Sequence, residues 1–150
     1  MNRVAKLRKR TVLVVQITCL ALFVAEKFGR VSICAGSSMF PTLTGNGDLV
    51  VIARDKLTNS KIHKGMLVES ISPLDPSIRV LKRITALEGE CVQLDSKAEH
   101  AQKIRIPKGH VWLTGDNLQQ SIDSRVYGPV SIALLKGVAK YRIWPSFKRL

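Results

Sequence analysis

Glycine and proline interrupt this chain so often after residue 30 that only short strands fit between them. A Gly45-Asn46-Gly47 turn precedes one apolar run, two prolines stand in 72–77, and Pro107-Lys108-Gly109 marks a further turn. Prolines that close together exclude a strand or helix interior. The runs between these turns are apolar or alternate in polarity. This pattern predicts a mainly β protein, a small, strongly bent antiparallel sheet or barrel rather than a parallel sheet.

The expected strands follow from these runs. They cover residues 31–34, 48–53, 65–71, 78–87, 91–94, 103–106, 110–114 and 137–144. Polar loops are expected at 55–64 and 95–102. The segment that starts at Val130 fits either a short helix or a strand.

The N-terminal segment differs from the rest of the chain. Residues 1–10 are basic without any acid, and residues 11–25 are apolar except for Gln16 and two threonines. An apolar stretch of this length is short for a bilayer and typical of a signal peptide, so a cleaved signal, a transit segment and a retained anchor compete. We favour an anchor helix, because cleavage at Ala35-Gly36-Ser37 would remove the lead-in to Ser38. The expected domains are 1–30, the basic flank and anchor, and 31–150, a β domain. The alternative is a buried helix of a soluble protein.

The charge of the chain indicates an anionic partner. Its formal net charge is +13 and its pI is near 10.2. No zinc-ligand spacing and no nucleic-acid-binding motif accompany this charge, and the basic clusters flank membrane-like segments, so membrane lipid is the expected partner and nucleic acid is not. The cysteines form no metal-binding pattern, so we predict no metal and no cofactor, with Cys34 and Cys91 reduced.

A candidate nucleophile lies in the segment 36–43, Gly-Ser-Ser-Met-Phe-Pro-Thr-Leu. It places small hydroxyl residues beside a proline that fixes the backbone, so that a side-chain oxygen is held in a defined direction. The alternative is an ordinary turn between two strands, since serine and proline are common in turns.

A serine needs a base, and histidine is the usual one. The three histidines lie in or beside polar loops with no evident Asp partner: His63, His100 and His110. Lys82 is the other candidate, because it shares one face of a predicted strand with apolar residues, and burial lowers the pKa of a lysine. The alternative is an edge-strand lysine whose ammonium group lies in water.

A third segment contains Gly115-Asp116-Asn117 and, after it, Ser121-Ile122-Asp123-Ser124-Arg125. In this order and spacing, the three segments resemble the signal peptidase I family over nearly the whole chain. The resemblance is closest to the mitochondrial inner membrane peptidase branch, of the catalytic subunit 1 type. The run His110 to Gln119 and Ile143-Trp144-Pro145 carry this closer likeness.

The resemblance implies roles for single residues. Ser38 matches the nucleophile and Lys82 the general base. Ser121 would hydrogen bond to the Lys82 amine. Asp123 and Arg125 would form an ion pair that keeps the carboxylate from raising the pKa of Lys82.

Three further positions depend on the same likeness. Gly36 stands where many bacterial members have a serine that supports the oxyanion hole, which leaves the backbone N–H of Ser38 as the donor. Met39 and Phe40 are candidates for lining the substrate groove, for resting on the lipid surface, or for plain packing.

The resemblance also implies a function, a membrane-bound serine endopeptidase with a Ser-Lys dyad. It would remove sorting peptides from precursor proteins delivered to the mitochondrial intermembrane space, from an inner-membrane anchor and beside a related second catalytic subunit. Substrates would bind as extended segments with small residues near the cut. The alternatives are a catalytically silent membrane-anchored β scaffold, a bacterial or thylakoid type I signal peptidase, and a self-cleaving repressor-like domain.

Overall fold

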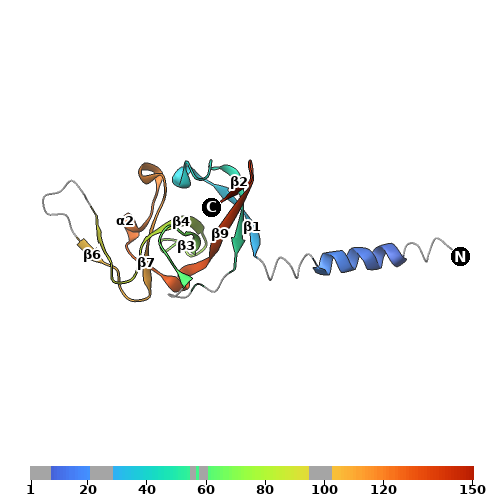
Figure 1. Cartoon of the computed structure of the whole chain (residues 1–150), viewed down its shortest axis with the longest axis horizontal. Coiled ribbons are helices and arrows are strands. Elements are labelled where there is room, and N and C mark those ends of the chain that lie inside the picture. Colours follow the sequence, from blue (N-terminus) through green and yellow to red (C-terminus); the bar gives the residue numbers. More distant parts are fainter. Residues whose placement is uncertain (1–7, 21–28, 55–56, 58–60, 95–102) are drawn as a thin grey trace.

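The computed structural model describes residues 8–20, 29–54, 57, 61–94 and 103–150 of the chain (Figure 1). Residues 8–20 form a helix whose side chains are all exposed, so they do not pack as the buried helix of the alternative interpretation. Among the helices of the described ranges, none is long and apolar enough to cross a membrane. The predicted loop at 95–102 and most of the loop at 55–64 lie outside the described residues.

The remainder is mainly β, as the sequence predicts. The strands are β1 (Arg30–Ala35), β2 (Asn46–Ala53), β3 (Leu67–Ile71), β4 (Arg79–Ala86), β5 (Cys91–Gln93), β6 (Lys103–Arg105), β7 (His110–Thr114), β8 (Val130–Ser131), β9 (Leu135–Trp144) and β10 (Lys148–Arg149). Short 3-10 turns cover Ser37–Met39, Leu118–Gln120 and Ile132–Leu134, and a single α-helical turn, α2, covers Ser124–Tyr127.

One antiparallel sheet organises the domain, and it curls on itself (Figure 1). Its strand order is β1-β2-β9-β3-β4-β7-β8, with β10 paired to β9, while β5 and β6 form a separate hairpin. The long strand β9 joins the halves, because it pairs with β2 through its second part and with β3 through its first. β1 is therefore an edge strand, which matters for the site below.

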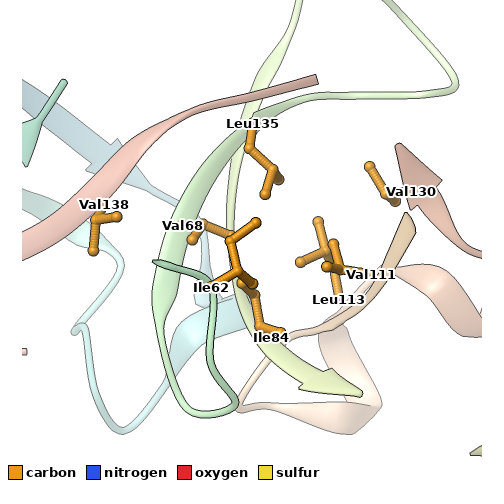
Figure 2. Packing of buried hydrophobic residues seen from close by; sticks show 8 residues of the cluster. All are labelled: Ile62, Val68, Ile84, Val111, Leu113, Val130, Leu135 and Val138. Atoms are coloured by element: carbon orange, nitrogen blue, oxygen red, sulfur yellow. The ribbon is translucent and has the colours of Figure 1, made fainter. Parts of the chain in front are cut away.

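Both faces of the sheet are covered by apolar side chains, so neighbouring residues of one strand enter different cores. Val68 and Ile84 belong to the cluster drawn in Figure 2, whose other members are Ile62, Val111, Leu113, Val130, Leu135 and Val138. Leu67 enters a second cluster with Met39, Leu43, Val50, Ile52 and Ala139. A third cluster surrounds the buried Trp112. The strand alternation expected in 137–144 fails for this reason, since Gly137, Val138 and Ala139 are all buried.

Candidate active site

The segment that carries Ser38 is fixed on both sides. It leaves β1 at Gly36, whose φ of 100° suits a residue without a side chain. The Gly36 N–H donates to the Gly45 carbonyl at 3.1 Å, and the Leu43 N–H donates to the Met39 carbonyl at 2.9 Å. Met39 is buried in the second core. Ser38 is thus a half-buried residue between anchored neighbours.

Lys82 lies inside the protein, on β4. It is 4% exposed and faces Val68 of β3, two residues before the fully buried Ile84. Its ammonium group takes part in no ion pair or hydrogen bond among the described residues. Burial lowers the pKa of Lys82; Asp123 raises that pKa and Arg125 lowers it. The alternative with the ammonium group in water is therefore wrong, although Lys82 lies on a stretch of β4 that pairs on one side only.

Ser38 and Lys82 line one cavity of about 390 Å³. The cavity lies between residues 32–36, which come from β1 and the segment after it, and residues 78–82, which come from β4 and the residue before it. The structure thus places Ser38 and Lys82, which the sequence pairs, on one cavity. A buried lysine that shares a cavity with a serine is an arrangement that suits acid–base activation of a hydroxyl.

The segment after β7 packs directly on the Ser38 backbone. The Asn117 N–H donates to the Ser38 carbonyl at 3.0 Å. Gly115 has no space for a side chain, because a Cβ there would lie 2.5 Å from the Ser38 carbonyl oxygen and 2.3 Å from Ser121 Oγ. The two distant segments are therefore fitted to each other at this glycine.

Asp123 and Arg125 form the ion pair that the sequence predicts. Arg125 Nε donates to Asp123 Oδ1 at 2.8 Å and its Nη2 to Oδ2 at 2.9 Å. The Gly115 N–H also donates to the buried carboxylate, at 3.0 Å. Burial alone would raise the pKa of Asp123, but these bonds outweigh it and lower the pKa to about 2. The carboxylate near Lys82 is thus ionised and neutralised at once.

A second ion pair was not anticipated from the sequence. Arg83 Nε and Nη2 donate to the two oxygens of Asp116 at 2.8 and 2.7 Å, and Thr42 Oγ1 donates to Asp116 Oδ2 at 2.5 Å. Through Arg83, which follows Lys82 on β4, these hydrogen bonds connect β4 to the segment that carries Ser38. No local sequence pattern links these three residues, which come from separate segments of the chain.

The other predicted residues lie in different surroundings. Phe40 is exposed and does not line the cavity, whereas Met39 does so from the core. Ser121 Oγ is buried near Asp123 and helps to lower the pKa of that carboxyl, and its contact with Lys82 stays a prediction.

The described histidines contact carbonyls and not carboxylates. His63 Nδ1 lies 3.1 Å from the Lys64 carbonyl oxygen, and His110 Nδ1 lies 2.9 Å from that of Lys108. His100 lies outside the described residues. The cysteines of the described ranges are free, Cys34 and Cys91 among them.

Comparison with known proteins gives consistent matches. The model of the family signal peptidase, peptidase S26, matches residues 7–98 and 93–144. Mitochondrial inner membrane protease subunit 1 of Xenopus tropicalis is 42% identical over 132 residues, which cover 87% of this chain and 78% of that protein. The subunit 1 of Schizosaccharomyces pombe is 39% identical over 135 residues, 88% of this chain and 84% of that protein. Subunit 2 of the mouse protease is 33% identical over 139 residues, 85% and 78% of the two chains.

Proposed function

The chain belongs to the signal peptidase family, peptidase S26, and from this premise we propose that it is a serine endopeptidase with Ser38 as nucleophile and Lys82 as general base. One observation carries the proposal: a lysine that is 4% exposed lines the same cavity as Ser38 and has no ion-pair partner in the described chain. Because burial lowers the pKa of Lys82, a larger fraction of its amine is uncharged and able to accept a proton than for an exposed lysine.

The chemistry follows from these two groups. The Lys82 amine takes the Ser38 proton as Ser38 Oγ bonds to the scissile carbonyl carbon. The ammonium then protonates the leaving amine as the C–N bond breaks, which leaves an acyl-enzyme. Lys82 next takes a proton from water as the water oxygen attacks the ester, and returns it to Ser38 Oγ as the ester C–O bond breaks, which releases the acid product and restores both residues. The Ser38 N–H would hold the oxyanion, while Gly36 offers no hydroxyl for this purpose.

The supporting residues act on Lys82. Arg125 neutralises Asp123, so this carboxylate stabilises the charged form of the Lys82 amine less and raises its pKa less. Ser121, whose buried hydroxyl lies near Asp123, would orient the amine once substrate excludes water.

The relatives suggest where and with what the enzyme works. They are named as subunits 1 and 2 of a mitochondrial inner membrane protease. We propose that this chain removes sorting peptides from precursors at that membrane, with its β domain in the intermembrane space and a related subunit beside it. Residues 1–30 would form the anchor, in line with the exposed apolar helix of 8–20.

Two variants test the proposal. Ser38→Ala and Lys82→Met are each expected to lower precursor cleavage by at least about 10⁴-fold, as loss of a nucleophile or base does. Ser37→Ala, the neighbouring serine, and Lys103→Met, an exposed lysine, are the matched controls and should keep activity. Circular dichroism checks folding. Unchanged cleavage in either Ser38→Ala or Lys82→Met would refute the Ser-Lys dyad, and absence of cleavage by the wild type would favour the silent scaffold.

A further inference from the structure

Glu69 is an acid in the interior of the domain that the proposed mechanism does not use. It lies on β3 opposite Leu81 of β4, is 4% exposed, and lines the cavity of Ser38 and Lys82. Burying a carboxylate is costly unless it is paired. The residues that pair with Glu69 therefore indicate which groups this side of the cavity can bind.

Two arginines share this one carboxylate. Arg30 Nη2 donates to both oxygens of Glu69, and Arg79 Nη1 donates to Oε2 at 3.2 Å. Arg30 belongs to β1 and Glu69 to β3, with β2 and β9 between them in the sheet. The contact hence spans the hollow of the curled sheet. Two guanidinium groups and one carboxylate leave a net positive charge.

The three side chains differ in what they show to an occupant of the cavity. The Glu69 side chain is 5% exposed and its oxygens are occupied, whereas Arg79 is 50% exposed and also lines the cavity. A guanidinium has five N–H donors, and among the described residues Arg79 uses one nitrogen, Nη1, toward Glu69. An occupant therefore meets hydrogen-bond donors that a carboxylate holds in place.

The backbone around the cavity suits an extended peptide. β1 pairs with β2 alone, and β4 pairs with β7 only from Arg83 onward, so residues 79–82 keep an unpaired edge within the described part of the chain. These two free edges border the cavity. Arg79 lies three residues from Lys82, roughly 10 Å along a strand. A segment cleaved at Ser38 would hence pass Arg79 within a few residues of the cut bond.

We propose that Arg79, positioned by Glu69, selects precursor segments that carry an oxygen-acceptor side chain, a carboxylate or an amide, within about four residues of the cleaved bond. The inference rests on the proposed function. It adds a polar side chain to the small residues that are expected near the cut. A purely structural role of the ion pair would affect stability but not the preference among substrates.

The test uses the full chain and a precursor series that carries Ala, Leu, Lys, Asp or Asn at each of the four positions on either side of the cut. At one position, the wild type should cleave the Asp or Asn precursor with a kcat/KM about tenfold above the Ala precursor, as expected for a hydrogen bond to a charged group. Arg79→Met should reduce this ratio to about twofold or less. Arg105→Gln, which removes an exposed arginine of β6, should keep it.

A second variant covers the case in which Arg79→Met does not fold. Arg79→Lys keeps the charge and loses the planar fork, so the preference for Asp should survive and the preference for Asn should fall. Equal ratios in wild type and both variants, or a wild type that prefers Ala at every position, would overturn the inference. Ser38-dependent cleavage without such a preference refutes the inference alone, while absence of Ser38-dependent cleavage refutes the proposed function.

Discussion

At the scale of single residues, the state of Lys82 depends on what surrounds it more than on its own position in the sequence. Its pKa is lowered first by burial, against the attraction of Asp123 and with the help of Arg125. Lys82 is 4% exposed, and the ion pair of Asp123 with Arg125 limits the effect of the carboxylate on its pKa. The lowered pKa of the proposed base therefore depends on these neighbours.

Gly115 is the residue where the two halves of the site fit together. Gly115→Ala would place a Cβ 2.5 Å from the Ser38 carbonyl oxygen and 2.5 Å from Ser121 Cβ. We expect a loss of about 1–3 kcal/mol in the free energy of unfolding, typical of overpacking. Cleavage should fall further than the folded fraction does, because the clash displaces Ser38.

Gly137→Ala is the matched control, since its Cβ would lie 2.5 Å from the Ala53 carbonyl oxygen and 2.6 Å from Ile52 Cγ2, and it would not meet Ser38 or Ser121. Urea unfolding and kcat/KM are measured for both variants. Similar destabilisation with loss of kcat/KM in Gly115→Ala alone supports the account. Equal kcat/KM per folded molecule in the two variants would contradict it.

At the scale of elements, Asp123 precedes the single turn of α2 and fastens it to the end of β7. It accepts hydrogen bonds from the Arg125 N–H at 3.2 Å and from the Gly115 N–H at 3.0 Å. The start of α2 and the residue after β7 are thus held by one carboxylate.

Asp123→Asn should lower the free energy of unfolding by about 2–4 kcal/mol near neutral pH, somewhat less than for a fully buried pair because Arg125 is partly exposed. The pKa of Asp123 is lowered from 3.8 to about 2, so its contribution is present above pH 3.8 and is lost as the pH falls through about 2. The difference between wild type and variant should therefore shrink over this interval. Asp75→Asn, in an exposed turn, is the control. A difference that stays constant from pH 5 to pH 2 would refute the assignment.

The strands show how much of the fold the sequence could predict. The strand expected at 78–87 is β4, Arg79–Ala86, and the parity that buries Lys82 with Ile84 is the one expected. Local turn residues and strand periodicity contain this information. Contacts between distant segments are absent from it: Glu69 owes its burial to Arg30, and Asp116 meets Thr42 74 residues away. The polar wall of the cavity and the second ion pair could not be predicted for this reason.

At the scale of the whole molecule, the N-terminal helix is the part whose exposure needs an explanation. Its apolar side chains, such as Val14 and Ile17, are about 60% exposed. Exposed apolar surface of this extent is typical of a segment that contacts lipid or a partner. The proposed anchor accounts for it.

Alkaline carbonate extraction tests the anchor. Full-length protein should stay with the membrane pellet, and Val14→Glu combined with Ile17→Glu should release it, because two charges are costly in an apolar environment. Leu74→Glu with Leu118→Glu introduces the same charges on exposed positions of the β domain and should not release it. Retention of the helix variant, or release of the wild type, would rule out the anchor.

The titration of Lys82 tests the central claim most directly. NMR of ¹³C-labelled lysine, with Lys82→Met to assign the resonance, gives its pKa beside those of the exposed lysines. The account predicts a pKa below the ordinary lysine value. It also predicts that kcat/KM rises with pH over the same interval, because the neutral amine is the base. A Lys82 that titrates together with the exposed lysines would contradict the account.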